Sequence, residues 1–203
     1  MLYIKLKGFK INKILDIYKK TNSLQEGHFV LSSGLHSPIY LQSAIVLSYP
    51  KYLKVIGKEL CILIKKKLNF KDIDLIISPA MGGVIIGSKV GEIMGIRSIF
   101  LEREKSELIL RRGFDIKKNS NTLVIEDVIT TGKSSEECIS AVKKYNAKVL
   151  GVFSIINRNV GNISHKIPRY SLVNLKAPLY SSDKLPDSLK SIPIRKPGSR
   201  FLK

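Results

Sequence analysis

The stretch from Thr122 to Ser134 limits the possible folds most strongly, because it joins a buried-strand pattern directly to the start of a helix. It begins with the apolar run Leu123-Val-Ile125, which is typical of a buried strand. Two adjacent carboxylates, Glu126 and Asp127, stand where that run ends. The small, hydroxyl-rich turn Thr130-Thr-Gly-Lys-Ser134 then leads into a helical pattern. Strand, turn and helix in this order indicate an α/β sheet.

The same stretch carries groups that suit a phosphorylated sugar. Ligands of open α/β sheets sit at the carboxyl ends of strands, and the N–H groups at a helix start favour a phosphate. Carboxylates beside such a loop can accept hydrogen bonds from sugar hydroxyls. Taken separately, the acids could be solvated caps and Gly132-Lys-Ser134 an ordinary turn. A Walker A loop is excluded, because the position five before Gly132 holds Asp127 instead of glycine.

An apolar strand, two acids, two apolar residues and Thr-Thr-Gly closely resemble the phosphoribosyl pyrophosphate (PRPP) motif of type I phosphoribosyltransferases. The resemblance implies that Glu126 and Asp127 hold the ribose hydroxyls and that the loop after them wraps the 5′-phosphate. The PRPP-binding residues that it implies here are Glu126, Asp127, Val128, Ile129, Thr130, Thr131, Gly132, Lys133 and Ser134.

Strand and helix patterns alternate from about residue 50 to residue 157. Helical spacing occupies 50–68 and 84–94, and short apolar runs at 74–78, 97–101 and 149–156 indicate strands. We therefore expect an α/β fold of the type I phosphoribosyltransferase kind, a mainly parallel sheet flanked by helices with a small N-terminal hood. We expect one domain over 1–203, with the α/β core at 49–164 and the hood or cap and tail at 1–48 and 165–203.

A glycine-containing turn, Pro79-Ala-Met-Gly-Gly83, follows the strand at 74–78. Glycine at a strand-to-helix turn lets the backbone approach an anion closely, although a simple tight turn would look the same. The resemblance makes this turn the pyrophosphate loop and adds Met81 and Gly82 to the PRPP-binding residues. Gly87 and Gly91 are expected to be helix-packing positions.

The segment from Gly27 to Gln42 contains two short extended runs separated by Gly34 and Pro38, which predicts a hairpin-like hood. His28 and His36 have no Cys, Asp or Glu at triad or ligand spacing, so we assign them to the hood and not to catalysis.

This segment resembles the N-terminal signature of the orotate phosphoribosyltransferase family. The resemblance places Ser33, Gly34, Tyr40 and Leu41 against the base, orotate. Ser32 stands where many members of that family carry a lysine that contacts PRPP.

The charged run from Glu102 to Phe114 has a β-like centre and a stop at Gly113. It is either a solvated hairpin or a mobile basic lid, which would exclude water and neutralise departing pyrophosphate. By resemblance Arg103 contacts PRPP, the lid reaches the site of a second subunit, and the protein is a homodimer. Glu104 replaces a family lysine, so the charge would come from Lys105, Arg111 or Arg112. The expected catalytic residues are Asp127, Glu126, Arg103 and Lys105.

Arg158 stands just beyond the strand at 149–156. A guanidinium at a strand's carboxyl end can grip a carboxylate with two hydrogen bonds, although a surface arginine would have the same position. The resemblance makes Arg158 and Thr130 contacts of orotate.

Composition bounds the partners. The chain has 203 residues and a net charge of +19, but its lysines are scattered and no nucleic-acid-binding motif is present. No apolar run has membrane-spanning length. Cys61 and Cys138 lie on apolar helical patterns, which indicates core thiols in a reducing compartment, the cytoplasm. The basic segment 1–13 leaves a targeting role open.

The resemblance implies an enzyme that transfers the 5-phosphoribosyl group from PRPP to N1 of orotate, with Mg²⁺ held mainly by PRPP and water and no protein metal site. Two alternatives remain. A purine or other pyrimidine phosphoribosyltransferase would share the PRPP motif but lack the hood and Arg158. A regulator that binds PRPP and nucleic acid would lack the charged run at 102–113 or carry an added DNA-binding module.

Overall fold

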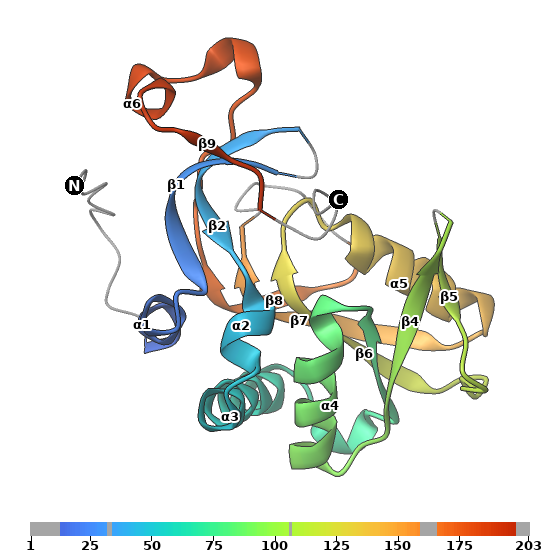
Figure 1. The fold of residues 1–203 in the computed structure, drawn as a ribbon. Helices are drawn as coiled ribbons and strands as arrows, with labels where there is room; N and C mark the ends of the chain where they lie inside the picture. Colours follow the sequence, from blue (N-terminus) through green and yellow to red (C-terminus); the bar gives the residue numbers. More distant parts are fainter. Residues whose placement is uncertain (1–12, 32–33, 106, 159–165, 198–203) are drawn as a thin grey trace.

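A six-stranded sheet forms the centre of the molecule (Figure 1). The computed structural model describes residues 13–31, 34–105, 107–158 and 166–197. The strand order is β5-β4-β3-β6-β7-β8, and every neighbouring pair is parallel except the β4–β5 hairpin. The strands are β3 (Leu75–Pro79), β4 (Ser98–Glu104), β5 (Glu107–Leu110), β6 (Asn121–Ile129), β7 (Lys148–Asn157) and β8 (Arg169–Asn174). The predicted α/β class with a mainly parallel sheet is confirmed.

Helices cover both faces of this sheet, because successive side chains of a strand point to opposite sides. Ile76, Leu123 and Ile125 pack into one core with the first four helices, whereas Leu75, Ile77 and Val124 pack into a second core with α5. The four helices of the first core are α1 (Lys13–Lys20), α2 (Ser43–Leu47), α3 (Pro50–Lys67) and α4 (Gly82–Met94). On the other face lies α5 (Lys133–Lys144), and a 3₁₀ turn, η1 (Phe70–Asp72), precedes β3.

A second, three-stranded sheet forms the hood, which stands above the main sheet in Figure 1. Its strands are β1 (Leu24–Val30), β2 (His36–Leu41) and β9 (Ile194–Arg195), in the order β2-β1-β9. The predicted hairpin is therefore present, and the C-terminal segment with η2 (Ser182–Lys184) and α6 (Asp187–Lys190) completes it.

The two histidines belong to the hood, as expected. His28 and His36 are buried, and His28 Nε2 lies 2.6 Å from His36 Nδ1. His28 Nδ1 lies 3.2 Å from the carbonyl oxygen of Ile192, which only accepts, so this nitrogen donates to the tail. The pair joins the hairpin to the tail.

Strand β8 lies within 165–203, the segment that the sequence analysis grouped with the hood, cap and tail. It forms an edge of the main sheet instead, in parallel register with β7 from Val152–Arg169 to Asn157–Asn174. Val173 is buried and the Arg169 side chain is 8% exposed, whereas the other residues of this edge strand are half-buried or exposed.

Three further expectations can be compared with the structure. Cys61 and Cys138 are buried free thiols, as expected. The charged run forms a β-hairpin, with Arg103 paired to Leu108 across the β4–β5 ladder, and its action as a lid stays a prediction. None of the described helices is long and apolar enough to cross a bilayer.

Candidate active site

The two strand-end acids of β6 lie in different surroundings. Glu126 is 5% exposed and its Oε1 accepts a hydrogen bond of 2.6 Å from Ser135 Oγ in the first turn of α5. Burial raises the pKa of Glu126 to about 7, with a smaller contribution from the neighbouring charge of Asp127, while the Ser135 hydrogen bond opposes the shift. Glu126 is therefore an acid that titrates near neutral pH.

Asp127 is half-buried and faces the N-terminus of α4. Its carboxylate fills the space that a side chain at Gly82 would need, since an added Cβ would lie 2.5 Å from Oδ1. Burial raises the pKa of Asp127, and hydrogen bonds from the Val128 backbone and the Ser43 side chain act in the opposite direction. The N-terminal dipole of α4 also favours the charged carboxylate.

A buried pair of hydroxyls stands behind Asp127. Tyr18 Oη of α1 and Ser43 Oγ of α2 are 2.9 Å apart, and both residues are buried. Because an ionised carboxylate only accepts, Ser43 donates to Asp127 and Tyr18 donates to Ser43. The first two helices thereby orient the catalytic carboxylate expected from the sequence.

The loop that joins β6 to α5 ends in an open helix N-terminus. Gly132 is the N-cap residue of α5 and has φ of +80°, a conformation that glycine adopts without strain. Thr131 Oγ1 accepts from the Lys133 backbone N–H at 3.4 Å. Thr130 and Thr131 are exposed and stand next to the N-terminus of α5, the kind of place where an anion can bind.

The glycine turn lies beside this loop, at the start of α4. Met81 is the N-cap residue and is 83% exposed, and Gly82 is also exposed. Behind the turn, α4 packs very closely on the sheet, since a Cβ at Gly83 would meet the Ile125 carbonyl oxygen at 2.7 Å. A Cβ at Gly87 would collide with Ser78, and one at Gly91 would lie 2.7 Å from the Ile96 carbonyl oxygen, which confirms both as packing positions.

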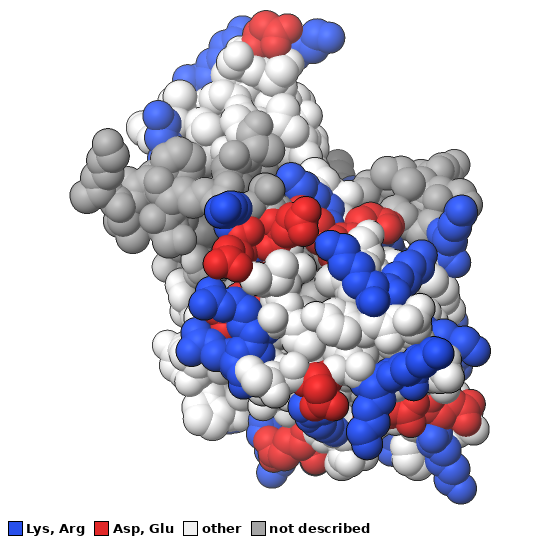
Figure 2. All heavy atoms as spheres, turned by 90° about the vertical axis from the view of Figure 1, so that its right-hand side faces the viewer, with Lys and Arg blue, Asp and Glu red and all other residues white. Residues whose placement is uncertain are grey.

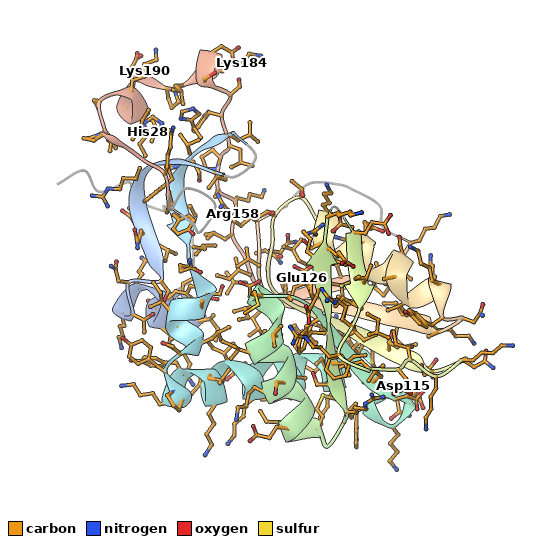
Figure 3. All side chains as sticks on the ribbon, turned by 45° about the vertical axis from the view of Figure 1, so that its right-hand side comes forward. His28, Asp115, Glu126, Arg158, Lys184 and Lys190 are labelled. Carbon is orange, nitrogen blue, oxygen red and sulfur yellow. The ribbon has the colours of Figure 1, made fainter. Side chains whose placement is uncertain are left out.

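Arg158 lies between the core and the hood, as Figure 3 shows. Its backbone N–H donates to the Ile129 carbonyl oxygen at 2.8 Å, and its Nη2 donates to Ser37 Oγ of β2 at 2.8 Å. Burial lowers its pKa from the ordinary value, and its buried Nε has no hydrogen-bond partner within the part of the chain that the structure describes. A half-buried guanidinium with an unused donor suits an anionic ligand.

The hood residues expected at the base occupy β2 and the turn before it. Gly34 is at the hairpin turn with φ of +82°, and Leu41 is half-buried at the end of β2. The Tyr40 ring lies 5.7 Å from the Phe29 ring, and its hydroxyl accepts from Gln42 Nε2 at 3.3 Å. Ser32 and Ser33 lie outside the described residues.

Two arginines of the charged run form ion pairs, one with α5 and one within the run. Arg103 pairs with Glu137 of α5, and this hydrogen bond raises the arginine's pKa. Arg112 pairs with Glu102 at 2.5 Å, and Lys105 is exposed at the turn with φ of +53°. Among the described contacts, the hairpin is joined to α5 and not to the strand-end acids. On this side of the molecule, basic side chains are interspersed with acidic ones (Figure 2).

Sequence reasoning missed two residues that adjoin the site, Ser43 and Arg169. Arg169 opens β8, and its side chain is 8% exposed and paired with Glu136 of α5. Both residues reach the site from elements far from the PRPP motif in the chain, and neither is part of a local pattern that marks a ligand.

Solved structures define the class of protein. The orotate phosphoribosyltransferase of Aeropyrum pernix superposes with a TM-score of 0.69 and 21% identity, over 80% of this chain and 94% of that one. At this identity the match shows the fold alone, which is the type I phosphoribosyltransferase fold. In the present chain the acid pair, the loop after β6 and the glycine turn after β3 lie at the carboxyl edge of the main sheet.

Sequence comparison narrows the class to a family. The orotate phosphoribosyltransferase of Thermotoga maritima is 44% identical over 190 residues, 94% of this chain and 100% of the relative. That of a Thermoanaerobacter species is 41% identical over 188 residues, 93% of this chain and 97% of the relative. No protein-family model matches the chain. With relatives of this identity over nearly its full length, the chain belongs to the orotate phosphoribosyltransferase family.

Proposed function

We propose that this protein transfers the 5-phosphoribosyl group from PRPP to N1 of orotate, giving orotidine 5′-monophosphate and pyrophosphate for pyrimidine nucleotide synthesis. The observation that carries the proposal is the position of Arg158. Its unpartnered Nε lies at the carboxyl edge of the sheet, beneath the hood. Orotate carries a carboxylate, and a guanidinium fixed at this point can bind it together with Thr130 and the hood residues Ser33, Gly34, Tyr40 and Leu41.

The acid pair and the loop would hold the phosphoribosyl group. Glu126 and Asp127 accept hydrogen bonds from the ribose hydroxyls, and residues 128–134 wrap the 5′-phosphate at the N-terminus of α5. As pyrophosphate leaves, positive charge develops on the sugar carbon. A carboxylate already oriented by Ser43 and the α4 N-terminus stabilises that charge without reorganising, which is the usual form of electrostatic catalysis.

The glycine turn and the hairpin would receive the leaving group. Met81 and Gly82 are exposed at the start of α4, where backbone N–H groups can face pyrophosphate. The carboxylates of the site are hard oxygen donors of the kind that suits Mg²⁺, but Glu126 is buried and Asp127 is only half-exposed. We therefore propose that Mg²⁺ arrives bound to PRPP and keeps water and substrate oxygens as ligands.

We further propose a homodimer in which Arg103 and Lys105 of the charged hairpin act on the neighbouring subunit's PRPP. The support is chemical: both cations lie on an exposed hairpin, and Arg103 pairs with Glu137 of α5. The two buried free thiols favour a reducing compartment, the cytoplasm. Basic and acidic side chains are interspersed on the face seen in Figure 2, and the sequence holds no nucleic-acid-binding motif, so we propose no nucleic-acid partner.

The test is PRPP-dependent consumption of orotate with Mg²⁺, measured beside uracil, adenine and hypoxanthine. We expect turnover with orotate alone, because only orotate offers Arg158 a carboxylate. Equal or faster turnover of a base without a carboxylate would reject the assignment of orotate, and no turnover of any base would reject phosphoribosyl transfer.

A further inference from the structure

Arg169 places a buried positive charge directly behind the loop that begins α5. Its side chain is 8% exposed, and its Nη2 pairs with Glu136 in the first turn of that helix. Its Nη1 lies against the Gly132 backbone, so closely that a Cβ at Gly132 would collide with it. The guanidinium therefore adjoins the N-cap residue of a helix of 12 residues.

Two of its donors are unused. Nε and Nη1 of Arg169 are buried and have no hydrogen-bond partner among the described residues. A buried donor without an acceptor is costly, and more so when the group is charged. The single ion pair with Glu136 satisfies only part of the guanidinium, which leaves capacity for a second anion.

The two ion-pair partners differ in freedom. The Glu136 side chain is 57% exposed and lies on the helix surface, whereas the Arg169 side chain is enclosed. Glu136 is therefore the exposed member of the pair and Arg169 the enclosed one, so an anion that arrives from solvent would compete with Glu136 for the guanidinium. The Glu136 carboxylate therefore occupies a position beside Arg169 that another anion could take.

We propose that Arg169 binds the phosphate of a sugar phosphate at Thr130–Gly132, to which it supplies positive charge and hydrogen-bond donors. Glu136 is the counter-ion of Arg169 that the phosphate displaces. The inference rests on the proposed function, because it identifies the 5′-phosphate end of PRPP as the ligand. The α5 N-terminus and the guanidinium would then act together on one phosphate.

The competing explanation is a purely structural role, a brace, in which the Arg169–Glu136 ion pair only fixes α5 against β8. The two explanations predict opposite changes in phosphate affinity when the charge of Glu136 is removed. If the carboxylate competes with phosphate, removing its charge strengthens phosphate binding. If the pair is a brace, removing either partner weakens binding alike.

The experiment is calorimetric titration of ribose 5-phosphate and of inorganic phosphate into the purified protein, together with KM values for PRPP and orotate. We expect Arg169→Gln to weaken ribose 5-phosphate about 10- to 100-fold, the range for charge-assisted hydrogen bonds. Glu136→Gln should bind it at least as tightly as the unchanged protein. The KM for orotate should not change in either variant, and Arg169→Lys should recover part of the affinity.

Arg97→Gln is the matched control, because Arg97 forms an exposed ion pair with Asp115 at 2.8 Å, and Figure 3 shows Asp115 at the opposite end of the core from the hood. Unchanged ribose 5-phosphate affinity in Arg169→Gln, or equal weakening in Arg169→Gln and Glu136→Gln, would overturn the proposal. If Arg169→Gln does not fold, Arg169→Lys and Glu136→Gln decide it. The titration needs no turnover, so a protein that binds ribose 5-phosphate through Arg169 but does not use orotate refutes the proposed function alone.

Discussion

Replacing Gly82 by alanine should displace the Asp127 carboxylate while leaving the fold intact. The added Cβ would lie 2.5 Å from Oδ1 and 2.8 Å from Cγ and Oδ2, whereas ordinary contact begins at 3.4 Å. The carboxylate must therefore move by about 0.9 Å. Gly82 is the first residue of α4 and has no positive φ, so alanine is compatible with its backbone.

A shift of this size should be visible in turnover. Misplacing a catalytic group by about 1 Å can lower the rate about 10²-fold, which equals about 2.7 kcal/mol of transition-state stabilisation. We expect kcat of Gly82→Ala to fall by about that factor. The melting temperature should change by only a few degrees, because the clash is with the end of a side chain and not with backbone.

Gly57→Ala is the matched control. Its Cβ would lie 2.7 Å from Lys89 Cγ, a similar clash, but with a long side chain that can rotate and that lies on α4 away from the acids. Steady-state kinetics and thermal unfolding of both variants form the assay. Full turnover in a folded Gly82→Ala protein, or an equal loss in Gly57→Ala, would show that the position of Asp127 does not govern the rate.

Three other predictions concern the charged groups of the site. Asp127→Asn should lower kcat by about 10²-fold or more with little change in melting temperature, as the loss of a preorganised charge does, and unchanged turnover in the purified variant would exclude that role. Arg158→Ala should raise the KM for orotate and leave that for PRPP nearly intact, since the Arg158 side chain contacts Ser37 of the hood and the substitution keeps the backbone hydrogen bond to Ile129; the reverse pattern in steady-state kinetics would reject its assignment. Glu126→Gln should gain stability relative to the unchanged protein as pH rises. Burial raises the Glu126 pKa from 4.5 to about 7, so the folded state binds this proton more tightly than the unfolded state. The free energy of unfolding of the unchanged protein therefore falls by up to about 3 kcal/mol as the pH rises from 4.5 to about 7. Parallel plots of melting temperature against pH for the two proteins would contradict this.

The main elements could be predicted because each is encoded locally. The apolar run Leu123–Ile125 specifies a buried strand, and the glycines of α4 stand four residues apart where the helix meets the sheet. Strand β8 could not be predicted in this way. It is half-exposed at the sheet edge and its side chains show no buried-strand pattern, so its strand conformation depends on hydrogen bonding to β7.

The same distinction applies to the site. Glu126, Asp127 and the loop after them are adjacent in the chain, so one motif identifies all of them. Ser43 and Arg169 approach the same groups from α2 and β8, and their roles depend on packing between distant segments. A lone serine or arginine has no sequence signal until the sheet places it.

The proposed function assigns the phosphoribosyl group and the base to different elements of the fold. In the proposed function, groups for the phosphoribosyl half come from β6, α4 and α5, which belong to the core. Groups for the base would come from β2 and Arg158, and a hydrogen bond joins Arg158 to Ser37 of β2. Because the tail strand β9 and the His28–His36 pair hold the hood together, the position of Ser37, and through it of Arg158, depends on the C-terminal segment. Loss of the tail should therefore change discrimination among bases before it changes binding of PRPP.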